Sequence, residues 1–161
     1  HKGIKKMDRK ELYNFAIAQE QRSQRLYQGL ARSFGEPETN AFFTELVGLE
    51  KEHELKLRNA FSQEFPGEEP EPESQEIKET PSVDLKDPAQ LLQFAISREE
   101  EAAKNYYSFA EKTEKGDIRE LLLHLAKEEE QHKTLLLTEM QRILGALQWF
   151  DSSELDGFMD F

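Results

Sequence analysis

The sequence predicts an all-α fold, a four-helix bundle made of two repeated helical hairpins joined by a long acidic crossover. Apolar residues recur at helical spacing through four long segments. An acidic, proline-rich stretch separates these segments into two pairs. The two pairs repeat a common pattern at a constant offset, since Glu20 and Tyr27 recur 79 positions later as Glu99 and Tyr106. The chain has the size of one domain, and we expect a single domain over residues 1–161.

The first hairpin is predicted to consist of helices at about residues 8–33 and 37–62. Gly35 and Pro37 separate the two helices, because glycine ends helices and proline is best tolerated in a first helical turn. Apolar residues fall on one face of each helix and define its core side. These residues include Leu12, Phe15, Ile17, Tyr27, Phe43, Leu46, Val47 and Leu57.

The acidic crossover is predicted to occupy residues 63–87. Between Ser62 and Pro88 there are nine acidic residues, two lysines and five of the six prolines, so this stretch carries −7 of the net charge of −12. Such a composition disfavours a packed core. We interpret the segment as an extended, solvated and partly mobile connection on the surface.

The second hairpin is predicted to consist of helices at about residues 88–113 and 117–147. Asp87, which is followed by proline, is a suitable N-cap for the first of them. A short turn at Gly116 and Asp117 joins the two helices, with Asp117 as the predicted N-cap of the last helix.

Composition and charge exclude several classes of protein. A net charge of −12 argues against binding to nucleic acids or anionic membranes, because both depend on clustered Lys and Arg. No apolar stretch approaches the roughly 20 residues needed to span a bilayer. The absence of cysteine excludes disulfides, iron–sulfur clusters and thiolate zinc sites. We therefore expect a cytoplasmic protein in which only oxygen and imidazole ligands could hold a metal.

Two helices each contain a Glu-x-x-His motif, which places a carboxylate and an imidazole on the same helical face. In both helices that face is the apolar one. The preceding helix of each hairpin contributes one further glutamate with apolar helical neighbours. The candidate metal ligands and catalytic residues are Glu20, Glu50, His53, Glu99, Glu129 and His132.

Four carboxylates on apolar helical faces require a compensating charge. Burying one unpaired carboxylate costs several kcal/mol, whereas a whole domain is stable by only about 5–15 kcal/mol. Two divalent cations would supply +4 against −4, and this ligand pattern is typical of di-iron and di-manganese carboxylate bundles. A single motif could be a surface salt bridge, but two in register are harder to obtain by chance. A bundle that has lost its ions is the alternative.

Other polar residues receive different interpretations. Tyr27 and Tyr106 carry hydroxyl groups on the carboxylate-lined face, where they are either core aromatics or hydrogen-bond donors to ligand glutamates. His124 is out of phase with Glu129 and His132, and we interpret it as a surface histidine rather than a ligand.

This constellation resembles the rubrerythrin branch of the ferritin-like di-iron superfamily. In each hairpin a tyrosine follows the first glutamate by seven residues, and the full pattern is Glu20, Tyr27, Glu50-x-x-His53, Glu99, Tyr106 and Glu129-x-x-His132. The resemblance covers about residues 8–147. Rubrerythrins usually carry a C-terminal rubredoxin with four cysteines, which this sequence lacks. They also place an additional glutamate, which takes part in iron movement during peroxide reduction, at the position of Ala102.

The resemblance implies a non-haem di-iron redox protein that lacks the rubredoxin domain. Glu50 and Glu129 would bridge two iron ions, for which manganese or zinc are possible substitutes. Glu20 and Glu99 would each bind one ion terminally, and the two histidines would complete the ligand sets. The iron pair would reduce peroxide or dioxygen with an external electron donor such as a rubredoxin.

Two other functions stay open at this point. The chain could bind and oxidise ferrous iron without catalytic turnover, or it could be a metal-free structural bundle. We expect a homodimer, and we interpret Trp149 and Phe150 as packing or dimer contacts. The tail at residues 151–161 mixes acidic and aromatic residues and is expected to pack as an appendage.

Overall fold

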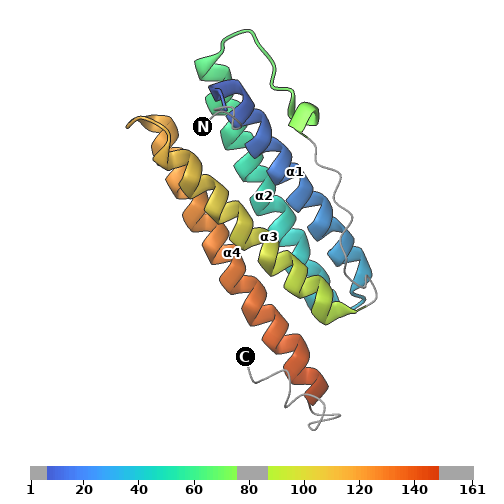
Figure 1. Cartoon of the computed structure of the whole chain (residues 1–161). Coiled ribbons are helices and arrows are strands. Elements are labelled where there is room, and N and C mark those ends of the chain that lie inside the picture. Colours follow the sequence, from blue (N-terminus) through green and yellow to red (C-terminus); the bar gives the residue numbers. More distant parts are fainter. Residues whose placement is uncertain (1–6, 76–86, 149–161) are drawn as a thin grey trace.

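The computed structural model describes residues 7–75 and 87–148 and has the predicted all-α architecture. Four long helices form an elongated bundle (Figure 1). The helix boundaries differ by no more than two residues from those expected from the sequence. The elements are α1 (Arg9–Ser33), α2 (Pro37–Glu64), a short 3₁₀ helix η1 (Pro72–Gln75), α3 (Pro88–Glu111) and α4 (Asp117–Gln148).

Local capping determines where the helices of the second hairpin begin. Asp87 caps α3 as predicted, because its carboxylate accepts a hydrogen bond of 3.0 Å from the backbone N–H of Ala89. Asp117 is not the N-cap of α4, so that prediction was wrong by one position. It is the first helical residue, and the backbone N–H of Glu120 donates to the carbonyl oxygen of Gly116 at 3.1 Å. Gly116 has a φ of +153°, a conformation that favours glycine over other residues.

The helices pair as two hairpins, α1 with α2 and α3 with α4, which pack together as a bundle (Figure 1). Two apolar clusters fill the interior, one on each side of a polar layer. One cluster includes Tyr27, Leu30, Phe43, Leu46, Leu92, Leu136 and Met140. The other includes Leu12, Tyr13, Ile17, Leu57, Phe61, Leu122 and Leu125. On every helix a buried glutamate lies between the residues of the two clusters, and these are Glu20, Glu50, Glu99 and Glu129.

The acidic crossover joins opposite ends of the bundle, since α2 ends far from the point where α3 begins (Figure 1). Its first part is more ordered than a solvated spacer. The backbone N–H of Glu71 donates to the side-chain oxygen of Asn14 at 2.7 Å, Pro72 is buried, and η1 packs against α1. Residues 76–86 lie outside the described residues, as do Trp149, Phe150 and the tail at 151–161.

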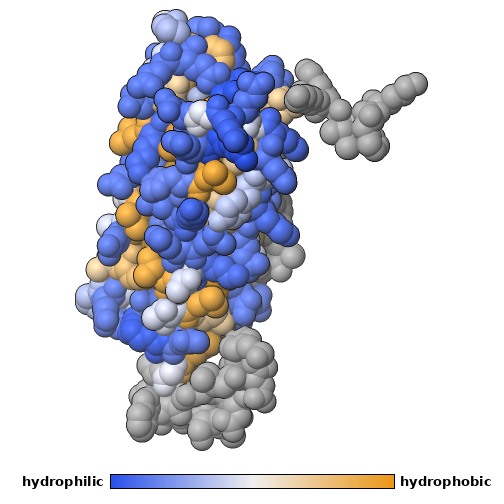
Figure 2. Space-filling model, turned by 90° about the vertical axis from the view of Figure 1, so that its left-hand side faces the viewer, coloured by the Kyte–Doolittle hydropathy of each residue, from blue (hydrophilic) through white to orange (hydrophobic). Residues whose placement is uncertain are grey.

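Most of the exposed residues in the described part of the chain are polar. Figure 2 shows one face that is mostly hydrophilic, with apolar side chains in separate small groups. Within residues 7–75 and 87–148, no helix is long and apolar enough to cross a membrane.

Candidate metal centre

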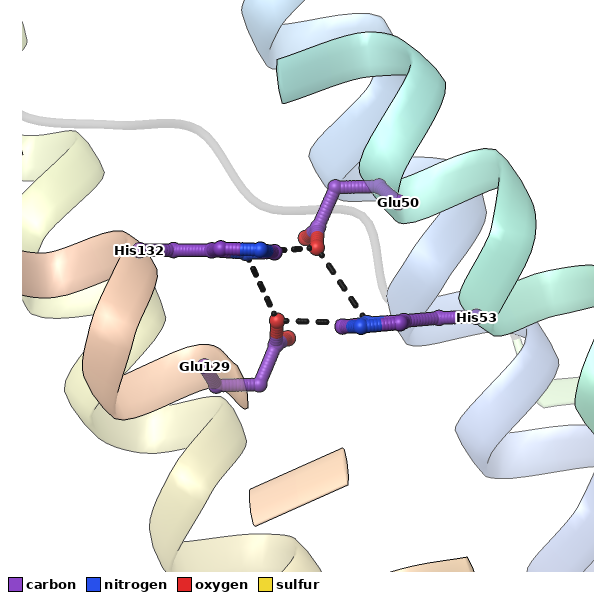
Figure 3. Close-up of side chains that lie close together, drawn as sticks. All are labelled: Glu50, His53, Glu129 and His132. Atoms are coloured by element: carbon purple, nitrogen blue, oxygen red, sulfur yellow. Dashed lines mark ion pairs between the residues drawn. The ribbon is translucent and has the colours of Figure 1, made fainter. Parts of the chain in front are cut away.

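The candidate site lies in the polar layer between the two apolar clusters. Helix α2 supplies Glu50 and His53, and α4 supplies Glu129 and His132. Figure 3 shows these four side chains pointing toward one another from the two helices. One ligand atom from each lies within 4.8 Å of the others, and all four residues are buried. The two Glu-x-x-His motifs, which are far apart in the sequence, therefore meet in one place.

Glu50 and Glu129 occupy central positions between the two imidazoles. Oε1 of Glu50 lies 3.3 Å from Nδ1 of His53 and 3.0 Å from Nδ1 of His132. Oε1 of Glu129 lies 3.3 Å and 3.1 Å from the same two nitrogens. The imidazole rings are nearly parallel, with centroids 5.3 Å apart and an interplanar angle of 9°. Each carboxylate thus faces both imidazoles, which would allow it to bind two ions at once.

Glu20 and Glu99 extend the cluster in the two hairpins. Oε1 of Glu20, on α1, lies 3.3 Å from Nδ1 of His53, and Oε2 of Glu99, on α3, lies 3.8 Å from Nδ1 of His132. Each hairpin therefore contributes one glutamate–histidine pair and one of the central carboxylates. The fold brings all six candidate ligands together.

Two tyrosines connect the hairpins by hydrogen bonds to these glutamates. The hydroxyl group of Tyr27, on α1, donates to Oε1 of Glu99, and that of Tyr106, on α3, donates to Oε2 of Glu20. Burial, together with the neighbouring carboxylates, raises the pKa of both phenols, so both keep their protons and remain donors. The sequence left open whether these tyrosines are core aromatics or hydrogen-bond donors. They are both, since their side chains are fully buried and their hydroxyl groups donate hydrogen bonds.

Among the described residues, eight buried side-chain atoms of this cluster have no hydrogen-bond partner. A buried polar atom without a partner costs about 1–3 kcal/mol, so such a concentration requires an explanation. All eight are oxygens or nitrogens of the kinds that bind metal ions. They are both oxygens of Glu50 and Glu129, Oε1 of Glu20, Oε2 of Glu99, and Nδ1 of His53 and His132.

The electrostatics of the cluster reflect its burial and its excess of carboxylates. Burial and the charges of neighbouring glutamates raise the pKa of Glu50, Glu129 and Glu99 well above the ordinary value. For His53, burial acts to lower the pKa, but the nearby carboxylates of Glu129 and Glu20 outweigh it and raise the pKa to about 12. Without added positive charge, the cluster therefore retains protons that carboxylates in water would lose.

Glu128 is a functional candidate that the sequence-based ligand set missed. Its Oε1 lies 2.8 Å from Nε2 of His53 and 3.2 Å from Nε2 of His124. The side chain of His124 is largely exposed, as predicted for a surface histidine. Burial acts to raise the pKa of Glu128, but the hydrogen bond from His53 outweighs it, so the pKa is lowered. A carboxylate on Nε2 leaves Nδ1 of the same ring free to bind a metal ion. In the sequence, the indication of this role is that Glu128 directly precedes the candidate ligand Glu129.

Comparison with known proteins shows which family this chain belongs to. The family model for rubrerythrin matches residues 11–85 and 90–159, which is most of the chain. The chain belongs to the rubrerythrin family. A solved structure described as a hypothetical protein from Pyrococcus furiosus is 26% identical to this rubrerythrin-family chain, with a TM-score of 0.69. The match covers 84% of this chain and 90% of that one, whereas no curated protein matches.

Two features distinguish this rubrerythrin-family chain from the pattern expected for rubrerythrins. Its sequence contains none of the cysteines with which a rubredoxin binds iron. Ala102 is 2% exposed and offers no ligand atom at the position of the additional glutamate. The described residues thus bring together the six candidate ligands predicted from the sequence, and position 102 adds no further one.

Proposed function

We propose that this chain is a di-iron redox protein that reduces hydrogen peroxide or dioxygen with electrons from an external donor. The observation that carries the proposal is the group of eight unpartnered, buried oxygen and nitrogen atoms on six residues. Membership of the rubrerythrin family supports the same conclusion. A metal-free structural bundle is disfavoured, because it would have to keep buried carboxylates protonated and would leave these polar atoms without hydrogen-bond partners.

The six side chains fit a pair of divalent cations in both charge and donor type. Four carboxylates carry −4 when ionised, and two ions carry +4. Glu50 and Glu129 would be shared between the ions, because each faces both imidazoles. The two remaining glutamate–histidine pairs would complete one ion each. Two ferrous ions, when bound, supply the two electrons that convert hydrogen peroxide and two protons into two water molecules.

The protein's own residues position and shield this chemistry. Tyr27 and Tyr106 fix one oxygen of Glu99 and of Glu20 and leave the other oxygen free to face the cluster. Glu128 fixes the ring of His53 through Nε2. The apolar clusters on both sides of the polar layer exclude water from the carboxylates.

A steady-state assay tests the peroxidase function. Iron-loaded protein is supplied with reduced rubredoxin and hydrogen peroxide, and rubredoxin oxidation is followed by absorbance. Sustained, protein-dependent oxidation over many turnovers is expected, with a Glu50→Ala variant as the inactive control. A rate equal to that of the control would refute peroxide reduction with this donor.

A ferroxidase without catalytic turnover is the second candidate, and Ala102 is the observation that favours it. The position of the additional glutamate is filled by a buried methyl group, so the iron movement associated with peroxide reduction lacks its ligand. In this case ferrous iron is the substrate that provides the electrons. Addition of Fe(II) to metal-free protein in air would then give oxidation of the bound iron, with no sustained consumption of peroxide when reduced rubredoxin is added.

A further inference from the structure

A groove of about 440 Å³ lies between α3 and α4 on the outside of the bundle and borders one of the six candidate ligands. Glu99, which is 1% exposed, lies among its lining residues, and so does the small residue Ala103. A water molecule takes up about 30 Å³ in the liquid, so the groove has room for several small polar molecules. It therefore leads from the surface to the buried residue Glu99, at one edge of the candidate site.

Two polar contacts cross this groove from α3 to α4. The hydroxyl group of Tyr107 donates to Oε1 of Glu130 at 2.6 Å, and Nζ of Lys133 lies 3.5 Å from Oε1 of Glu100. Both contacts are solvent-exposed. Exposed contacts of this kind contribute little stability, so they can open at low cost in free energy.

The repeat provides an internal comparison, because the same positions in the first hairpin form a groove between α1 and α2. That groove has about 380 Å³ and is lined by Glu54, which is the counterpart of Lys133, and by Pro72 of η1. Its lining includes none of the six candidate ligands. Glu20, the counterpart of Glu99, is therefore not reached from this side.

A hydrogen-bonded network closes the floor of the α1–α2 groove. The buried carboxylate of Glu54 accepts hydrogen bonds from Nε2 of Gln24 at 2.8 Å, Nε of Arg58 at 2.8 Å and Nε2 of Gln21 at 3.2 Å. Gln24 is the counterpart of Ala103, so a long amide side chain occupies the place that a methyl group leaves open in the second hairpin. The two halves of the duplicated fold thus differ in access to the site.

We propose that small polar molecules and metal ions reach the candidate ligands through the α3–α4 groove, over Ala103 and past Glu99, and not through its counterpart between α1 and α2. This inference rests on the proposed metal centre. It adds the direction of entry and the residues that control it, namely Ala103, with Tyr107 and Lys133 at the rim.

Cysteine labelling tests the proposal, because the chain has no other cysteine. Thr134→Cys places a thiol on the exposed rim of the α3–α4 groove, and Leu55→Cys places one at the matched position of the first hairpin. Each variant is alkylated with a bulky maleimide. Cobalt(II) uptake by the metal-free protein is then followed by stopped-flow absorbance, and metal content is measured after equilibration.

The label at position 134 is expected to slow cobalt uptake by about tenfold or more, because it obstructs the groove, without changing the final metal content. The label at position 55 is expected to leave the rate unchanged. Equal rates for both labelled variants, or slower uptake with the label at 55, would overturn the proposal. A loss of final metal content in all proteins, the unmodified chain included, would instead contradict the proposed metal centre.

An Ala103→Leu variant provides a second test without a label. The larger side chain is expected to fill the groove next to Glu99 and to slow both cobalt uptake and the reaction of reduced, iron-loaded protein with peroxide. Circular dichroism and the thermal midpoint establish that the variant folds. Unchanged rates in a folded Ala103→Leu protein would contradict entry by this route, whether or not the wild-type protein turns over peroxide.

Discussion

Acidification from pH 7 to 5.5 is expected to stabilise the metal-free protein and to destabilise the metal-loaded protein. Glu50, Glu99 and Glu129 have raised pKa values in the fold, compared with an ordinary value of 4.5. At pH values above 4.5 the folded state therefore holds protons that the unfolded chain has lost. The stability that these groups contribute is complete below pH 4.5 and falls as the pH rises through their folded-state pKa values.

The other shifted groups do not reverse this sign between pH 5.5 and 7. His53 has a pKa raised from 6.5 to about 12, so its contribution is also lost as the pH rises above 6.5. Glu54 and Glu128 have lowered pKa values, and burial acts against this lowering in both. Their contributions are lost only as the pH falls below about 4.5, which lies outside the range tested.

The size of the effect follows from the number of protons retained. Each proton held by the folded state and not by the unfolded state changes the free energy of unfolding by about 1.4 kcal/mol per pH unit. One glutamate therefore contributes about 2 kcal/mol over 1.5 pH units. In a domain of this size that corresponds to a rise of about 4–8 °C in the thermal midpoint, and each further retained proton adds to it.

Bound metal ions reverse the direction, because they keep the carboxylates ionised and compete with protons for them. At a 100-fold excess over the dissociation constant, a ligand stabilises the folded state by about 2.7 kcal/mol, and acidification reduces this contribution. Differential scanning calorimetry of chelator-treated and manganese-loaded protein at pH 5.5 and 7 measures both effects. A Glu50→Gln/Glu129→Gln double variant is the control and should show a smaller pH dependence when metal-free. A midpoint of the metal-free protein that falls on acidification would refute the argument.

Further variants test individual residues of the site. Glu50→Ala and Glu129→Ala are each expected to remove most of the bound metal, because each carboxylate faces both imidazoles, whereas His124→Ala should leave metal content unchanged. Metal analysis of purified protein checks this, and two ions per chain in both glutamate variants would contradict the site assignment. Tyr27→Phe and Tyr106→Phe each remove a hydrogen bond to a glutamate of the candidate ligand set and are expected to weaken Mn(II) affinity by about 10–100-fold. Titration calorimetry measures this affinity, and unchanged values would leave the tyrosines a packing role alone.

The sequence alone determined the helices, the duplication and the six candidate ligands. Helical periodicity and capping are local properties, so segments such as Pro37–Glu64 could be placed to within two residues. The repeat then identified Glu129 within a run of three glutamates, because its counterpart is Glu50. The helical face on which each ligand lies was also fixed locally, since residues three or four apart share a face.

Only the tertiary structure decided the contacts between helices. Tyr27 binds Glu99 of the other hairpin rather than Glu20 of its own helix, because the bundle places α1 against α3 at this level. The neighbour that fixes His53 is likewise Glu128 of α4.

The crossover and the two grooves also depended on tertiary packing. From composition, we expected residues 63–87 to be solvated. In the structure, η1 packs on α1 and Pro72 is buried. This burial depends on the neighbouring helix and not on the composition of the segment itself. The repeat predicted equivalent halves, whereas the different side chains at Gln24 and Ala103 give the two grooves different floors. A repeat in sequence fixes the position of a side chain on its helix. What that side chain fills depends on the helices packed beside it.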